Sequence, residues 1–179
     1  MTRRFDRDKE GEKIHMQSLS ALAHIDYNQP GLFSYEQTIL MMDRLGISIQ
    51  EIEQQVLRAI FNVIGRNQDD HVKNIAYLMD KNGEWHLSPA FDLSYSFDPY
   101  GYWTNQQQMS INGKRDQFEK DDLIQFAAIA GIKKNRADEM IENVVLAMKS
   151  WPELAEENEI ETDRIKQIQS THRISLFKK

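Results

Sequence analysis

The hydrophobic positions of the chain follow a helical period over much of its length. The clearest stripe runs from residue 49 to residue 64, where apolar residues recur mostly at steps of three and four. Ser48 and Glu51 stand at the two positions of a capping box, so a helix is expected to begin there, and Gly65 is expected to end it. The width of the stripe predicts a helix that is buried within the domain rather than lying on its surface.

Other helices are predicted on both sides of this one. Ser34 and Gln37 form a second capping-box pair before a helix that is expected to end near Gly46. Amphipathic patterns predict three more helices, at 121–130, 135–151 and 162–173. Pro152 is expected to stop the second of these three, and the acidic stretch 153–161 is expected to be a solvated turn or a first helical turn.

A short strand pattern replaces the helical period near the middle of the chain. Two apolar runs, 75–79 and 85–87, are separated by residues 80–83, which end in an Asn-Gly pair. This pair supplies the positive φ angles that a tight hairpin turn needs. With one more short strand expected at 13–17, the fold class is mainly α-helical with a small β-hairpin (α+β).

Composition narrows the possible classes of protein. The chain has 179 residues, of which 40% are hydrophobic and 28% charged, as expected for one soluble domain. The absence of cysteine excludes disulfides and thiolate zinc sites. No apolar run approaches the ~20 residues of a membrane span and no signal peptide is visible, so a cytoplasmic location is expected. The net charge of −6 argues against non-specific nucleic-acid binding.

The candidate chemistry lies around the hairpin. Asp69 stands five residues before Asn74, and Asp92 follows the second strand. This spacing is that of kinase catalytic and metal-binding loops, in which a carboxylate accepts the proton of the attacking hydroxyl. Asn74 and Asp92 would then hold Mg²⁺ against the nucleotide phosphates. The alternative is a chance match, because Asp and Asn are common in turns and a D-x-x-x-x-N spacing alone is unspecific.

Two segments resemble a known family. The loop Asp69-Asp70-His71-Val72-Lys73-Asn74 is similar to the D-x-H-x-[KR]-N loop of the HipA family of bacterial toxin kinases. Residues 87–93 (LSPAFDL) resemble that family's L-x-P-x-x-D-[IL] metal-binding segment, and the stretches 4–7 (RFDR) and 109–114 (MSINGK) match as well. In the first of these, Arg4 and Asp6 on either side of Phe5 suggest the end of a strand. The similarity covers essentially the whole chain.

This resemblance implies that residues 1–179 are the C-terminal, larger lobe of a kinase-like fold. The catalytic and metal-binding loops would lie at 66–97 and a helical remainder at 118–179. It implies ATP-dependent phosphorylation of a serine or threonine hydroxyl on a protein, with ATP and Mg²⁺ as cofactors. The residues that would carry the reaction are, as catalytic groups, Asp69, His71 and Lys73; as cofactor-binding groups, Lys73, Asn74 and Asp92; and as metal ligands, Asn74 and Asp92. Asp70 remains an alternative base, although only Asp69 keeps the five-residue step to Asn74.

The resemblance also implies partners. In the best-known relatives the substrate is an aminoacyl-tRNA synthetase, and a DNA-binding antitoxin neutralises the kinase. The expected partners are therefore ATP, a protein substrate and a HipB-like antitoxin, with DNA contacted only indirectly and no membrane. The eight glycines are never closer than twelve residues apart, so no glycine-rich phosphate loop is present. The N-terminal nucleotide-covering lobe is expected to be absent, and the isolated chain to have little or no activity.

Two other functions stay open. One is a non-catalytic binding module that contacts an antitoxin or another partner protein, favoured by the missing lobe but disfavoured by the retained site residues. The other is a lipid kinase, since phosphoinositide kinases carry a similar D-x-H-x-x-N loop, although no basic or amphipathic membrane face is visible. The aromatic stretch 94–108 predicts a long loop that serves either in activation and substrate docking or only in packing.

Overall fold

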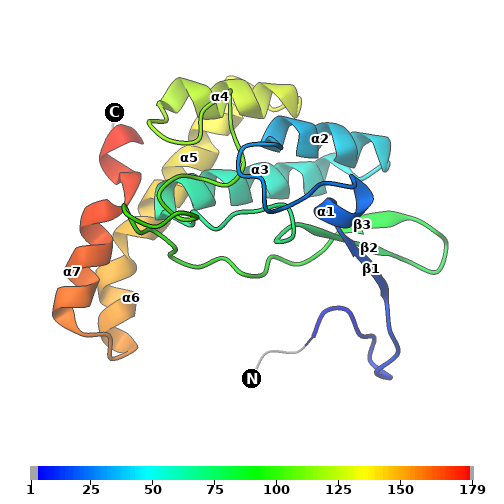
Figure 1. Cartoon of the computed structure of the whole chain (residues 1–179), viewed down its shortest axis with the longest axis horizontal. Helices are drawn as coiled ribbons and strands as arrows, with labels where there is room; N and C mark the ends of the chain where they lie inside the picture. The colour runs from blue at the N-terminus through cyan, green and yellow to red at the C-terminus, as the bar shows by residue number, and fades with distance from the viewer. Residues whose placement is uncertain (1–3, 178–179) are drawn as a thin grey trace.

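A computed structural model describes residues 4–177, and it shows a mainly helical fold with one small antiparallel sheet (Figure 1). The helix α3 runs through the middle of the molecule, with the sheet at one end and α6 and α7 at the other. The elements in chain order are β1 (His15–Ser18), α1 (Leu19–Leu22), α2 (Tyr35–Arg44), α3 (Ile49–Gly65), β2 (Ala76–Met79), β3 (Trp85–Leu87), α4 (Lys120–Ile129), α5 (Lys134–Lys149), α6 (Trp151–Glu157), α7 (Thr162–Thr171) and the 3₁₀ helix η1 (Arg173–Phe177).

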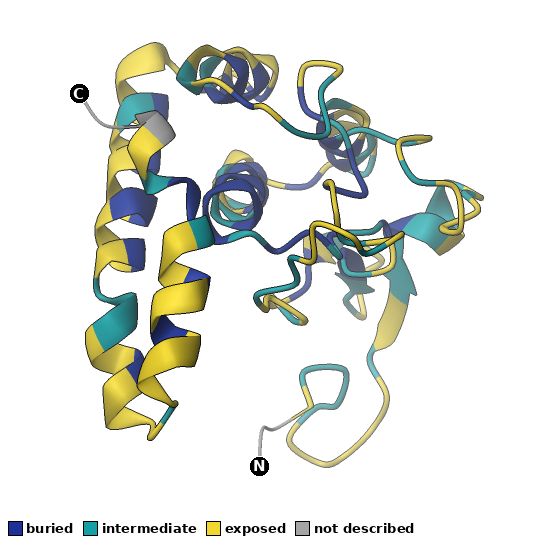
Figure 2. Ribbon diagram, turned by 60° about the vertical axis from the view of Figure 1, so that its left-hand side comes forward, coloured by how far each residue is buried: buried dark blue, intermediate teal, exposed yellow. Residues whose placement is uncertain are grey.

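The central helix α3 is buried because its apolar stripe meets other elements on several sides. It contacts α2, α4, α5, β3 and η1, and Ile60, Val63 and Ile64 are fully inaccessible to solvent. Figure 2 shows the buried positions of the surrounding helices turned toward it. Both predicted capping boxes are present, at Ser34 of α2 and Ser48 of α3. The sequence therefore predicted the start and the burial of this helix correctly.

The end of α3 differs from the prediction. Gly65 is the last helical residue, and the left-handed residue that ends the helix is Arg66, with φ 61°. Gly65 lies against α5, where an added Cβ would come within 2.8 Å of Met148 Cε. The absence of a side chain at Gly65 therefore lets α3 pack closely on α5. Arg66, not Gly65, turns the chain into the loop that carries Asp69 and Asn74.

The hairpin is part of a three-stranded sheet with the order β1-β2-β3. The first strand pairs with β2 antiparallel, His15 facing Met79 and Ser18 facing Ala76. In the turn, Asp80 Oδ1 accepts hydrogen bonds from the backbone N–H groups of Asn82 (2.8 Å) and Glu84 (2.9 Å). Only Gly83 of the Asn-Gly pair has a positive φ, of 86°. The prediction for this pair was wrong at Asn82, because the Asp80 carboxylate closes a longer turn that needs one left-handed residue.

The C-terminal helices also differ in detail. As predicted, α5 ends before Pro152, at Lys149, and Pro152 itself lies in the first turn of the next helix, α6. A proline fits there because the first N–H groups of a helix have no intrahelical acceptor. The acidic stretch 153–161, predicted as a solvated turn or a first helical turn, is helical as far as Glu157. The last predicted helix ends at Thr171 and continues as η1, and α6 and α7 form an antiparallel pair that projects from the body (Figure 2).

The first described residues form an N-terminal arm, which contains a turn stabilised by ion pairs. Asp6 accepts hydrogen bonds from the guanidinium groups of Arg4 (2.8 and 2.6 Å) and Arg7 (2.8 Å). The expected strand end at 4–7 is therefore wrong for residues 5 and 6, which form a turn, while Arg7 makes a single bridge to Lys13. No helix in the described part of the chain is long and apolar enough to cross a membrane.

Acid is expected to destabilise the fold through His172. Its ring lies against those of Tyr95 (6.4 Å) and Trp151 (6.0 Å), and burial, aided by the charge of Arg66, lowers its pKa below the usual range. Between the ordinary histidine pKa and this lowered value, the unfolded chain binds a proton that the folded chain does not. The stability that neutral His172 contributes to the fold is therefore fully present above the ordinary histidine pKa, and it is lost as the pH falls from there through the lowered pKa of the folded state. Melting temperatures at pH 7.5 and 5.5 should differ less for His172→Phe than for the unmodified chain; an equal difference would contradict this assignment.

Candidate functional site

Asp69 and Asn74 lie on one loop that the end of α3 positions. The left-handed Arg66 turns the chain, and the backbone N–H of Asn67 donates to Asn62 O (3.0 Å) in the last turn of the helix. Further along, the Asn74 side-chain Nδ2 donates to the backbone oxygen of Asp69 (2.9 Å). The five-residue step between the two residues therefore corresponds to a closed loop whose ends are joined by a hydrogen bond.

Asp92 is held near this loop through its backbone. It has a left-handed conformation (φ 53°) and an exposed side chain, and its carbonyl oxygen accepts a hydrogen bond from Asn67 Nδ2 (3.2 Å). The same Asn67 nitrogen donates to Asn62 Oδ1 (3.0 Å). Beside Asp92, the ring of Phe91 packs on Phe5 of the N-terminal arm at 5.6 Å. Asn67 thus links the helix, the Asp69 loop and the Asp92 segment.

The two adjacent aspartates of the loop differ sharply. Asp70 is 2% exposed and accepts hydrogen bonds from the Tyr35 hydroxyl (2.7 Å), Gln107 Nε2 (3.1 Å) and the backbone N–H of Gln108 (2.6 Å). Burial raises the pKa of Asp70, and these hydrogen bonds oppose that rise. The Asp69 side chain is 45% exposed. Asp69 is therefore the accessible carboxylate of the two, and the buried Asp70 serves to fix the loop.

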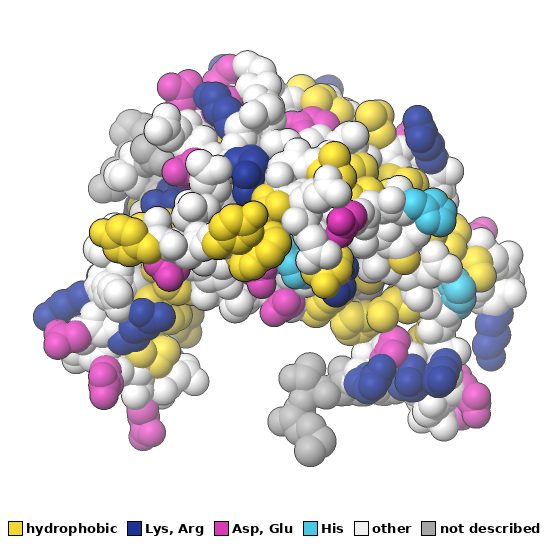
Figure 3. All heavy atoms as spheres, viewed as in Figure 1, with side chains coloured by type: hydrophobic (Ala, Val, Ile, Leu, Met, Phe, Trp, Pro, Cys, Tyr) yellow, Lys and Arg dark blue, Asp and Glu magenta, His cyan; other side chains and the backbone are white. Residues whose placement is uncertain are grey.

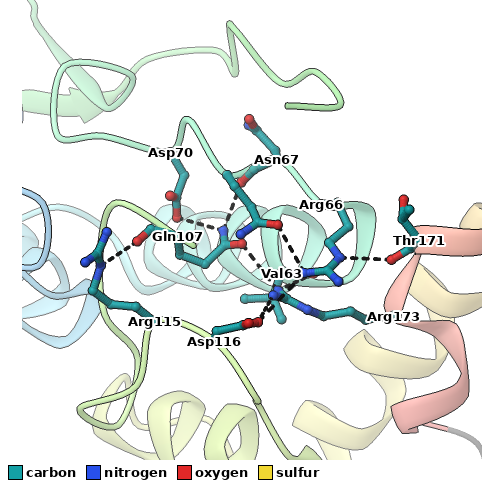
Figure 4. Close-up of polar contacts among 10 residues, drawn as sticks. Val63, Arg66, Asn67, Asp70, Gln107, Arg115, Asp116, Thr171 and Arg173 are labelled. Atoms are coloured by element: carbon teal, nitrogen blue, oxygen red, sulfur yellow. Dashed lines mark hydrogen bonds and ion pairs between the residues drawn. The ribbon is translucent and has the colours of Figure 1, made fainter. Parts of the chain in front are cut away.

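A buried polar network extends from Asp70 to the C-terminus (Figure 4). Gln107 Nε2 donates to Asn67 O (2.8 Å) as well as to Asp70, and its Oε1 accepts from Arg173 (3.3 Å). Arg173 also donates to Val63 O (3.1 Å) and pairs with Asp116. Burial, with the nearby charge of Arg66, lowers the pKa of Arg173 to about 10. The loop that carries Asp69 is thus linked through Gln107 to Arg173, about 100 positions later in the chain.

His71 and Lys73 lie beside Asp69 without a direct hydrogen bond to it. His71 Nε2 is 3.8 Å from Asp69 Oδ1, beyond hydrogen-bonding distance. Lys73 Nζ lies 3.8 Å from the centre of the Tyr27 ring, a cation–π contact. The structure therefore places His71 next to the candidate base and turns Lys73 toward Tyr27.

The candidate residues line different cavities. Asp69 and His71 line an open cavity of about 260 Å³. Asn74 lines a narrow one of about 10 Å³, which also contains Asn67, Phe91 and Leu93, and which is the size of a single water. The structure thus brings Asn74 to the residues flanking Asp92, whereas Asp69 faces a separate space.

The donor atoms near Asp92 suit a hard cation. Mg²⁺ prefers carboxylate and amide oxygens, and the Asn74 carboxamide uses its nitrogen on Asp69, which leaves its oxygen for another partner. Asn67 Oδ1 is buried without a hydrogen-bond partner among the described residues. These oxygens are of the kind that Mg²⁺ prefers. Asn74 and Asn67 line the narrow cavity together, whereas Asp92 does not line it.

The sequence reasoning assigned no role to the polar residues that support the loop. Asn62 donates to the Tyr35 hydroxyl (2.9 Å), which in turn donates to Asp70. A signal was present: Gln55 and Asn62, seven residues apart, place polar side chains on the buried face of an otherwise apolar helix. Gln107 gave no comparable signal, because its role depends on a loop whose path the sequence does not reveal.

Comparisons with known proteins show the family and the fold of the chain. Residues 1–151 match the model of the HipA-like C-terminal domain. A Haemophilus influenzae protein named "Putative kinase" is 24% identical over 180 residues, which cover 87% of this chain and 50% of that protein.

A solved structure is also similar. It is the Shewanella oneidensis MR-1 toxin-antitoxin complex of HipA, HipB and operator DNA, which matches with a TM-score of 0.62 and 18% identity, over 98% of this chain and 42% of that one. The chain thus spans half the length of the curated relative, and at this identity the structural match shows the fold. By the extent of the family match, the chain belongs to the family of HipA-like C-terminal domains.

Proposed function

We propose that this chain is the C-terminal catalytic lobe of an ATP-dependent serine/threonine protein kinase. The observation that carries the proposal is the pair of hydrogen bonds from Asn74 to the Asp69 backbone and from Asn67 to the Asp92 backbone. The first closes the loop that carries Asp69, and the second ties the Asp92 segment to Asn67, which is itself bonded to Asn62 in the last turn of α3. Membership of the HipA-like family and the similarity to a named kinase support the same function.

In this proposal each residue has a distinct task. Asp69, exposed at the open cavity, orients the acceptor hydroxyl and takes its proton as the oxygen attacks phosphorus. Asn74 and Asp92 would hold Mg²⁺, with the buried Asn67 oxygen as a further candidate donor. When bound, Mg²⁺ neutralises phosphate charge. Lys73 would leave Tyr27 to assist at the phosphates, and His71 would position Asp69.

The proposed partners follow from the relatives. A HipA–HipB–DNA complex is among the structural neighbours, so a HipB-like antitoxin is proposed to bind this protein and to supply its only link to DNA. The protein substrate is proposed to be a folded protein, with an aminoacyl-tRNA synthetase as the first candidate. Figure 3 shows that the lower edge of the molecule is hollowed between the N-terminal arm and α6 and α7, which leaves room for a second lobe or a partner.

Phosphoryl transfer by the chain with and without a second lobe tests the proposal. Because the nucleotide would be gripped from one side only, the isolated chain should show little or no Mg²⁺-dependent phosphorylation. The same chain joined to the N-terminal lobe of a relative should phosphorylate protein. Robust activity of the isolated chain would overturn the need for a second lobe, and calorimetry that detects no Mg-ATP binding in either form would favour a non-catalytic binding module.

A further inference from the structure

The end of α7 and the start of η1 reach both segments of the candidate site. Thr171 is the last residue of α7, His172 follows it, and Arg173 is the first residue of η1. We call these three residues the C-terminal clasp. They lie beyond residue 151, where the match to the family model ends. The family match therefore says nothing of these residues, whose contacts in this chain indicate a role.

Arg173 fixes the orientation of the amide that holds the Asp69 loop (Figure 4). Gln107 is fully buried, and its Oε1 accepts a hydrogen bond from Arg173 Nη1 (3.3 Å). Its Nε2 donates to Asn67 O (2.8 Å) and to the Asp70 carboxylate (3.1 Å). A guanidinium has donors only, so it pairs with the oxygen of this amide and not with its nitrogen. If the amide were turned around, its oxygen would face the two oxygen acceptors of the loop.

The clasp also contacts the segment that follows Asp92. The hydroxyl groups of Tyr95 and Thr171 form a hydrogen bond (3.1 Å). Arg66 joins the same region, because its Nε donates to Thr171 O (2.9 Å) and its own carbonyl oxygen accepts from the N–H of Ser96 (3.0 Å). The chain that carries Asp92 is therefore bound to the clasp three residues later, at Tyr95.

The charge of Arg173 is better suited to setting geometry than to adding stability. A buried ion pair contributes little net stability, and apolar residues of similar volume often replace it without loss. The Arg173 side chain is only 4% exposed, and besides Gln107 it bonds to Val63 O (3.1 Å) and pairs with Asp116. Val63 lies near the end of α3. The guanidinium therefore joins the helix that positions the Asp69 loop to the amide that holds the loop.

Resting on the kinase function proposed above, we propose that Arg173 is a positioning residue of the phosphoryl-transfer site. It acts through Gln107 on the loop that carries Asp69, while the rest of the clasp holds the segment that carries Asp92. In this role Arg173 itself contacts neither the substrate nor the metal. Loss of its hydrogen bonds should therefore slow the transfer step more than it weakens the binding of nucleotide.

Kinetics of the two-lobe form test this role. Arg173→Met keeps a long unbranched side chain but has no donors. It should lower kcat about 10- to 100-fold, since a displacement of about 1 Å at a reacting group can cost ~10²-fold in rate. The KM for Mg-ATP should stay unchanged. A fall in kcat accompanied by an equal rise in KM, or no fall in kcat, would contradict the positioning role.

Two variants of α7 separate positioning from stability. Ile165→Ala, at a buried position, leaves a cavity; it should lower the melting temperature and keep kcat in assays below that temperature. Lys166→Met removes an exposed charge from the same helix and should change neither quantity. If Arg173→Met loses no more kcat than Ile165→Ala, the effect is one of stability and the proposal is overturned.

NMR spectra of the isolated chain separate this proposal from the kinase function, because they require no phosphoryl transfer. Arg173→Met should shift the backbone amide signals of residues 67–74, and Ile165→Ala should leave those signals in place. If no two-lobe protein transfers phosphate, the kinase function falls, and shifted signals would still show that Arg173 positions the loop. Unshifted signals at 67–74 in Arg173→Met overturn the positioning role, whether or not the protein is a kinase.

Discussion

Asp69→Asn in the two-lobe form is expected to lower phosphoryl transfer by about 10²- to 10⁴-fold, the usual contribution of a positioned general base. The substitution removes the proton acceptor but keeps the shape of the side chain. It should leave the fold intact because the Asp69 backbone oxygen, not its carboxylate, accepts the hydrogen bond from Asn74. Initial rates at saturating Mg-ATP measure the loss of phosphoryl transfer, and the melting temperature measures whether the fold is intact.

The neighbouring residue offers a matched control for this experiment. Asp70→Asn removes the same charge one position away, but it replaces an acceptor by a donor in front of the Tyr35 hydroxyl or Gln107. We therefore expect the first variant to lose activity at unchanged stability, and the second to lose stability. Full activity of stable Asp69→Asn would show that Asp69 is not the base.

The largest expected loss of stability comes from Asp70→Ala. Three buried donors, on Tyr35, Gln107 and the Gln108 backbone, would be left without their acceptor. Breaking a buried charged network in this way costs about 3–5 kcal/mol, which corresponds to a fall in melting temperature on the order of 10 °C for a chain of this size. Thermal unfolding followed by circular dichroism measures the change.

An exposed aspartate gives the comparison for that measurement. Asp43 is exposed in the last turn of α2, and Asp43→Ala should change the free energy of unfolding by less than about 0.5 kcal/mol. Tyr35→Phe should fall between the two, at about 1–3 kcal/mol, because it leaves one donor and one acceptor unpaired. An Asp70→Ala protein as stable as Asp43→Ala would mean that the network does not support the loop.

Those parts of the fold that depend on nearby residues could be predicted from the sequence. The capping boxes at Ser34 and Ser48 are contacts between residues three apart, and the apolar stripe of α3 determines its burial. The sequence did not predict that β1 pairs with the hairpin of β2 and β3, because the pairing of β1 with β2 joins residues about 60 positions apart. Pro152 correctly predicted the end of α5, but α6 was not predicted as a helix of its own, although proline also fits the first turn of a helix.

For the candidate site, the spacing predicted residues but not their environments. The sequence predicted a loop that carries Asp69 and Asn74, and the structure adds that a hydrogen bond joins the two residues. The burial of Asp70 could not be predicted, because its partners Gln107 and Gln108 follow more than 35 residues later in the chain. The same holds for the cavity at Asp69, whose wall includes Trp103 from a loop that the sequence left without a definite role.

The position of the divalent ion tests the central claim most directly. Mn²⁺, a paramagnetic substitute for Mg²⁺, can be titrated with ATP into the two-lobe protein while the backbone amide signals of this chain are followed by NMR. If the proposed metal site is correct, broadening is centred on Asn74 and Asp92 and is lost in Asp92→Asn. A different group of donors, at Asp80, Glu84 and His86 in the hairpin turn, has ligand atoms within 4.8 Å of one another. Broadening centred on that turn, with Asn74 and Asp92 unaffected, would contradict the proposed kinase site.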